Sequence, residues 1–178
     1  MKPQRIGFDV DGVLADFHPY LCKLAIKKYG NASTESRLKM EASILDSEKD
    51  EFWSRIHPID VQATMVGMSL ESFGDYRFFI TRRPPCTHAA TQNWLSQHFG
   101  FGGNDVLISG AIEKGQVVAG LYLDGYFDDD PIHLIQVHKL SPKTAPYLVD
   151  HPYNQWFDEE RWNKEHSAPD RFDIMRVK

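Results

Sequence analysis

The chain has 178 residues, 42% of them hydrophobic, which is enough for one ordered globular core with room for an inserted subdomain. A formal net charge of −5 argues against non-specific binding to a nucleic-acid polymer, but not against a small anionic substrate held by a local cation. The two cysteines lack metal-type spacing, and we see neither an apolar run of membrane-span length nor a secretion signal. We therefore expect a soluble cytoplasmic protein with free thiols and no membrane partner.

The N-terminal segment predicts a buried strand at residues 5–8 that opens into a bend at Gly12. Asp9 and Asp11 stand at this opening, where two carboxylates can converge on one cation and one phosphoryl group. By itself, however, Asp-x-Asp-Gly is equally typical of a calcium loop or a solvated surface turn. Its interpretation therefore depends on the rest of the chain.

Residues 18–72 have little strand character and predict helices. The first helix would end at Gly30, and a second is expected at residues 34–45. Ser47 would cap a third helix, with Asp50 three positions on imitating a capping box. We interpret this block as a helical insertion between two strands.

Beyond residue 72, strands alternate with helices of about ten residues, which indicates βαβ units. The fold class expected is α/β, with a Rossmann-like three-layer parallel sheet and helices on both faces. The tail from Trp156 gives no interpretable pattern. The strands are predicted at 76–81, 105–109, 125–127 and 145–149, and the helices at 87–99, 114–121 and 132–137.

Polar side chains follow four of the predicted strands. Because the carboxyl ends of parallel strands lie at one edge of the sheet, these side chains should meet in one cleft. Chance can supply any one of them, but four in this arrangement are much harder to obtain by accident. The residues are Asp9 and Asp11, Thr81, Lys114, and Asp128 with Asp129.

This order of motifs resembles that of the haloacid-dehalogenase-like phosphohydrolases. Asp9-x-Asp11-Gly12 and the acidic pair after an apolar strand are the more specific motifs, whereas Thr81 and Lys114 are weak when taken alone. Three longer strings look like those of the 5′(3′)-deoxyribonucleotidases: residues 9–17, Phe52-Trp53 and residues 148–154.

The resemblance implies that residues 1–17 and 73–178 form a Rossmann-like catalytic core, and that residues 18–72 form a small helical cap over the cleft. It also implies that Phe17 faces the substrate and that Trp53, or its neighbour Phe52, helps to build an aromatic pocket. Aromatic residues at helical spacing are, on the other hand, typical of a packed core.

The residue types suit the hydrolysis of a phosphomonoester. By resemblance, Asp9 would be the nucleophile that forms an aspartyl-phosphate, and Asp11 the general acid and then the general base. Lys114 would neutralise negative charge, while Thr81 and the backbone N–H of Arg82 would hold phosphate oxygens. Taken singly, Thr81 is as typical of a helix cap as of a phosphate site. Lys114, taken singly, is as typical of a solvated helix end.

Magnesium is the expected cofactor, because the charge of the nucleophile repels phosphate and Mg²⁺ accepts carboxylate, water and phosphate oxygens. The resemblance implies Asp9, the backbone carbonyl of Asp11 and one of the acidic pair as ligands. We favour Asp129 as the direct ligand and Asp128 as a water-mediated partner. Asp130 is expected to be a solvated loop residue.

Two features depart from the deoxyribonucleotidase pattern. Arg82-Arg83 replaces a small polar residue after the threonine, and arginine there is either a second phosphate clamp or a surface charge. The stretch between Lys114 and the acidic pair is also longer than is expected for the deoxyribonucleotidases, and it has room for a helix. The eight histidines have no metal-ligand spacing, so surface or core roles are expected for them.

The sequence thus predicts a magnesium-dependent phosphatase, specifically a 5′-nucleotidase that acts on (deoxy)ribonucleoside monophosphates. Two alternatives remain open. One keeps the chemistry and changes the substrate to a sugar phosphate or another small phosphomonoester. The other is a non-catalytic domain that binds a nucleotide or a partner.

Overall fold

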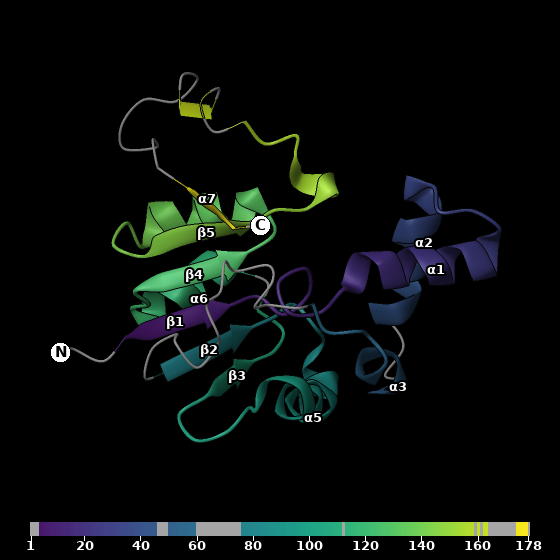
Figure 1. Ribbon diagram of the computed structural model, residues 1–178, viewed down its shortest axis with the longest axis horizontal. Coiled ribbons are helices and arrows are strands. Elements are labelled where there is room, and N and C mark those ends of the chain that lie inside the picture. The colour runs from purple at the N-terminus through teal and green to yellow at the C-terminus, as the bar shows by residue number, and fades with distance from the viewer. Residues whose placement is uncertain are drawn as a thin grey trace.

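The computed structural model of the chain describes residues 4–45, 50–59, 76–111, 113–158, 160, 162–163 and 174–177. These residues contain a six-stranded, fully parallel sheet in the order β3-β2-β1-β4-β5-β6 (Figure 1). The predicted α/β class with a Rossmann-like parallel sheet is confirmed. The strands are β1 (Arg5–Phe8), β2 (Tyr76–Ile80), β3 (Val106–Ile108), β4 (Gly125–Asp128), β5 (Ala145–Val149) and β6 (Met175–Val177).

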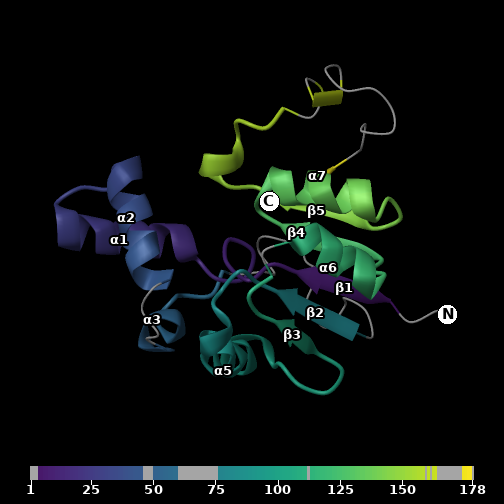
Figure 2. The same ribbon diagram turned by 180° about the vertical axis from the view of Figure 1, so that it is seen from behind.

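Helices cover both faces of the sheet, and successive strand residues point to opposite faces, so each strand contributes side chains to both cores. On one face, the ring of Phe8 stacks between those of Phe79 and Phe127, at 5.9 and 5.1 Å, against α5 (His88–Phe99). On the other face, Tyr126 and Leu148 pack against α6 (Lys114–Leu121) and α7 (Pro131–Leu140), which Figure 2 shows in front of the sheet. Strands covered on both sides read as continuous apolar runs in the sequence.

The elements predicted after residue 72 are all present, with small differences at their ends. Helix α7 continues to Leu140, beyond the predicted end at residue 137. Asp130, expected to be a solvated loop residue, is the N-cap of this helix and accepts a hydrogen bond from the backbone N–H of Ile132 at 2.9 Å. Three short elements in the described part of the chain were not predicted, because three residues are too few to show a period. They are the 3₁₀ helices η2 (Pro85–Thr87) and η3 (Pro152–Asn154) and strand β6.

Helices α1 (Phe17–Tyr29), α2 (Thr34–Leu45) and α3 (Asp50–Ser54) lie beyond the carboxyl ends of the strands (Figures 1 and 2). The predicted stop of α1 is confirmed: its C-cap, Gly30, has a φ of 79°, in the left-handed region. The predicted N-cap of the third helix, Ser47, is outside the described residues. No helix in the described part of the chain combines the length and the apolar character needed to cross a bilayer.

Candidate functional site

Three carboxylates meet where β1 and β4 end. Oxygen atoms of Asp9, Asp128 and Asp129 all lie within 4.8 Å of one another. The backbone N–H of Asp9 donates to the carbonyl of Phe127 at 2.8 Å, which continues the β1–β4 ladder into the cluster. Gly12, with a φ of 84°, is required here, because a Cβ on it would lie 2.2 Å from Oδ2 of Asp129. The predicted convergence of these strand ends is thus present in the structure.

Lys114 is the first residue of α6, and its side chain is buried beside the cluster. Its Nζ lies 2.6 Å from Oδ2 of Asp9 and 3.1 Å from Oδ2 of Asp128. Burial by itself would lower the pKa of the Lys114 ammonium, but the charges of Asp128 and Asp9 outweigh burial and raise it above the ordinary value. Lys114 is therefore a fixed cation next to Asp9, rather than a solvated helix end.

Asp128 is completely buried, and both of its carboxylate oxygens are occupied. Oδ2 accepts hydrogen bonds from Nζ of Lys114 at 3.1 Å and from the Tyr126 hydroxyl at 2.9 Å. Oδ1 accepts from the backbone N–H of Asp130 at 2.9 Å and lies 3.2 Å from Nδ1 of His133. Burial favours the neutral acid, but Lys114 and His133 outweigh it and hold the pKa of Asp128 well below its usual range.

Asp129 is held differently, by the turn that follows β5. The Tyr153 hydroxyl donates to Oδ2 of Asp129 at 2.6 Å, and the Asn154 amide donates to the Asp129 backbone carbonyl at 2.8 Å. Nε2 of His151 donates to the carbonyl of Gly12 at 2.6 Å. Burial and the neighbouring charge of Asp128 raise the pKa of Asp129 to about 7. The turn therefore ties the β1 loop and the β4 loop together.

Sequence reasoning assigned no role to Tyr153 and Asn154, and expected only a surface or core role for His151. They belong to the string at residues 148–154 that carried the family resemblance, and that string was the available signal. Tyr153 and Asn154 contact a loop about 25 residues earlier in the chain, and His151 contacts Gly12, 139 residues earlier. No periodicity within the segment encodes this arrangement.

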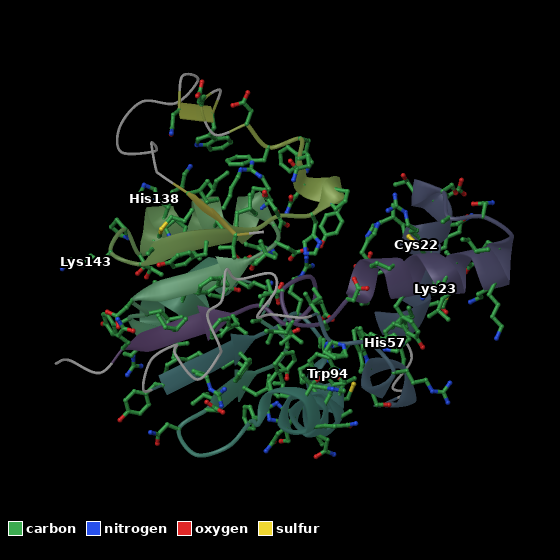
Figure 3. The ribbon with its side chains drawn as sticks, viewed as in Figure 1. Cys22, Lys23, His57, Trp94, His138 and Lys143 are labelled. Carbon is green, nitrogen blue, oxygen red and sulfur yellow. The ribbon has the colours of Figure 1, made fainter. Side chains whose placement is uncertain are left out.

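Asp11 is paired with Arg83, a residue whose partner was not predicted. Nε of Arg83 lies 2.9 Å from Oδ2 of Asp11, and Nη2 lies 2.7 Å from Oδ1, so the two groups form a fork. The Arg83 side chain is 1% exposed, and its guanidinium lies 4.8 Å from the ring centroid of Trp53 and 5.6 Å from that of Trp94. Trp94, labelled in Figure 3, also donates to the carbonyl of Ile56 at 2.8 Å.

The three residues after β2 alternate between the inside and the outside of the protein. Thr81 and Arg83 are buried, whereas the Arg82 side chain is exposed. The hydroxyl oxygen of Thr81 accepts the backbone N–H of Arg83 at 3.1 Å, which leaves its O–H as a donor. Extending the strand's alternation by three residues would have predicted a buried side chain at Arg83 and an exposed one at Arg82.

Phe17 and Trp53, the predicted substrate contacts, pack on each other at 6.0 Å with nearly parallel rings. Trp53 is 2% exposed, and its Nε1 has no hydrogen-bond partner among the described residues. Phe17 is half-buried and also lines a cavity of about 180 Å³. In this structure the indole of Trp53 therefore belongs to the core, and Phe17 is the ring at a cavity wall.

Magnesium is expected to raise the melting temperature more at pH 8 than at pH 6. The pKa values of Asp9 and Asp129 are raised mainly by burial, and that of His133 is raised by Asp128 against the effect of burial. Groups whose pKa is higher in the folded state bind more protons there, so their stabilising contribution is lost as pH rises through the folded pKa. The metal-free protein should therefore lose several degrees of melting temperature between pH 5.5 and 8.

A cation bound to the ionised carboxylates opposes this loss. The measurement is thermal unfolding from pH 5.5 to 8, with EDTA or with excess magnesium. An equal magnesium effect at both ends of the range would show that these carboxylates are not where the ion acts.

Among curated proteins, one from Oceanobacillus iheyensis named "Putative nucleotidase OB0422" is similar to this chain. The two sequences are 29% identical over 178 aligned residues, which cover 85% of this chain and 89% of that protein. No family model matches the chain. The similarity to a protein with a nucleotidase name thus extends over most of both sequences.

Proposed function

We propose that this protein is a phosphomonoester hydrolase that forms an aspartyl-phosphate at Asp9 and acts on (deoxy)ribonucleoside 5′-monophosphates. The observation that carries the proposal is the meeting of Asp9, Asp129 and Lys114 at one edge of a parallel sheet. The motif order that resembles the haloacid-dehalogenase-like phosphohydrolases supports the reaction type. The name of the relative from Oceanobacillus iheyensis supports the substrate class.

The donor set fits magnesium. Three carboxylates lie within 4.8 Å of one another, and hard oxygen ligands of this kind suit a small divalent cation. Asp129 and Asp9, with the backbone carbonyl of Asp11, would hold the ion directly. Asp128 would act through water, because both of its oxygens already accept hydrogen bonds from the protein. When bound, the ion would offset the carboxylate charge and polarise the phosphoryl oxygens.

The side chains supply the nucleophile, the proton transfers and the charge neutralisation. A carboxylate oxygen of Asp9 attacks phosphorus, the ester P–O bond breaks, and Asp11 gives a proton to the leaving alkoxide. Asp11 then takes a proton from the water that attacks the aspartyl-phosphate, which releases inorganic phosphate and restores Asp9. Lys114 screens the charge on Asp9, while the Thr81 hydroxyl and the Arg82 backbone N–H donate to phosphoryl oxygens.

Helices α1 to α3 stand at the sheet edge that carries these groups, a placement that supports a cap role for residues 18–72. A covering element excludes water during phosphoryl transfer and restricts which esters enter. Small phosphomonoesters are therefore the expected substrates.

Phosphate release should be fastest from nucleoside 5′-monophosphates and should stop when EDTA removes magnesium. The test is a panel of these nucleotides and of sugar phosphates, each assayed for free phosphate with magnesium and with EDTA. A clear preference for sugar phosphates would favour the first alternative. Absence of release from the whole panel, together with measurable nucleotide binding, would favour the non-catalytic alternative and contradict the proposal.

A further inference from the structure

Asn154 holds the turn after β5 firmly against the loop after β4. Its side-chain amide donates to the carbonyls of Asp129 and Val149, at 2.8 Å each. Its side-chain oxygen accepts the backbone N–H of His151 at 3.0 Å. The residue is 1% exposed, and a buried amide whose donors and acceptor are all engaged makes a rigid joint. Tyr153, which directly precedes Asn154, therefore has a fixed backbone position.

The carboxylate of Asp129 is fixed by contacts with Gly12 and Tyr153. It packs so closely on Gly12 that a Cβ there would lie 2.2 Å from Oδ2 of Asp129. The same oxygen accepts the Tyr153 hydroxyl at 2.6 Å. Because a hydrogen bond to a carboxylate is directional, this one selects one rotation of the group about its Cβ–Cγ bond. Tyr153 thus sets the orientation in which Asp129 meets a cation.

Helices α1 and α2, which belong to the proposed cap, reach Tyr153 through His18. His18 lies in the first turn of α1, and its ring centroid is 4.8 Å from that of Tyr153, with 35° between the planes. From α2, Nη1 of Arg37 lies 2.9 Å from Nε2 of His18, which must accept because a guanidinium only donates. A chain of contacts therefore leads from the cap helices to the Asp129 carboxylate.

The members of this chain between Arg37 and Asp129 carry no charge. Burial, Arg37 and His151 lower the pKa of His18, so its imidazole is neutral at pH 8. Burial and the charge of Asp129 raise the pKa of the Tyr153 hydroxyl, so it keeps its proton and remains a donor. An effect of either ring on a cation at the cluster must therefore pass through contact and not through Coulomb attraction.

We propose that Tyr153 is a positioning residue for Asp129, and that His18 supports Tyr153 so that the cap helices contribute to magnesium affinity. The inference rests on the proposed function, because it takes Asp129 as a ligand of the ion, and it adds a route by which the cap regulates that site. Both rings act through Asp129 and not on the reacting atoms.

The test of the positioning role is a calorimetric titration of the substrate-free protein with magnesium chloride at pH 8, which needs no turnover. Tyr153→Phe should weaken magnesium binding by about 10-fold, as the loss of a partner behind a metal ligand does elsewhere. Tyr147→Phe is the matched control. It removes a hydroxyl from a ring that stacks on Phe127 within the sheet, and it should leave magnesium affinity unchanged. Thermal unfolding in EDTA verifies that both variants are folded.

The same titration tests the link to the cap. His18→Ala should weaken magnesium binding by about 3-fold, within the range of mutations that act through intermediate residues. His18→Phe keeps a ring against Tyr153 and should restore the wild-type affinity. In a Tyr153→Phe background, His18→Ala should cause no further loss, because the hydroxyl through which it acts is already gone.

The outcomes separate this inference from the proposed function. If Tyr153→Phe binds magnesium as the wild-type protein does, the positioning role is wrong and the phosphatase proposal stands. If the losses of Tyr153→Phe and His18→Ala multiply, or if His18→Phe fails to restore affinity, the route from the cap is wrong. A wild-type protein that binds no magnesium contradicts both the inference and the magnesium-dependent function.

Discussion

Asp9→Asn is expected to lower kcat for nucleoside monophosphates by at least about 10⁴-fold, because an amide cannot form the aspartyl-phosphate. The substitution removes the proposed nucleophile while keeping the side chain's shape. Single-turnover assays with excess protein, followed by detection of free phosphate, measure the loss directly. Acid-stable phosphoprotein should also disappear in the variant.

The fold should survive this change. The backbone N–H of Val10 donates to Oδ1 of Asp9 at 2.7 Å, and the Asn oxygen can accept the same bond. Lys114 loses one anionic partner but keeps Asp128 at 3.1 Å. Circular dichroism and thermal unfolding would verify that the variant is folded.

Asp105→Asn is the matched control. Asp105 is paired with Arg77 and stands just before β3, at the opposite edge of the sheet from the carboxylate cluster. This variant should keep full turnover even if it loses stability. Retention of more than about 1% of wild-type kcat by Asp9→Asn would remove Asp9 as the nucleophile, because a lost covalent route costs far more than that.

The strand ends could be predicted because they follow from local patterns and one general rule. Apolar strands with polar residues at their carboxyl ends are visible in the sequence, and parallel pairing brings those ends together. Asp9, Lys114 and Asp129 were therefore expected near one another, and the structure places them so. Their individual chemical roles remain predictions.

The partners of these residues were not predictable in the same way. Arg83 is buried against Asp11 because two indole rings enclose its guanidinium, and those rings come from α3 and α5. Tyr153 reaches Asp129 from a turn that has no periodic pattern. Both contacts are set by tertiary packing, whereas the sequence pattern reports only local periodicity.

Arg83→Gln is expected to lower kcat by roughly 10²- to 10³-fold, because it releases Asp11, the proposed general acid and base, from the fork that fixes its carboxylate. Arg83→Lys should recover little of this loss, since an ammonium cannot make two parallel hydrogen bonds to one carboxylate. Arg83→Gln should also lose about 3–5 kcal/mol of stability, the usual cost of removing one partner of a buried ion pair, whereas Arg83→Lys keeps the charge and should lose less. Activity must therefore be measured well below each variant's melting temperature.

Arg77→Gln separates the loss of an ion pair from the loss of function. Arg77 also makes a fork with a carboxylate, that of Asp105, and its guanidinium lies 5.8 Å from the ring centroid of Phe79. It stands on the same strand as Phe79 but toward the edge away from the cluster. Arg77→Gln should lose stability as Arg83→Gln does, while its kcat stays at the wild-type level.

A double-mutant cycle then decides what Arg83 does. If Arg83 acts only by orienting Asp11, kcat of Asp11→Asn/Arg83→Gln should equal that of Asp11→Asn alone, because the second change removes nothing further. If the two losses multiply, Arg83 contributes independently, as a phosphate clamp would. The first result is expected, since both oxygens of Asp11 already occupy the Arg83 fork. The guanidinium of Arg83 is covered by two indole rings, and its donors already serve both oxygens of Asp11 and the hydroxyl of Thr91, so we expect it to act through Asp11.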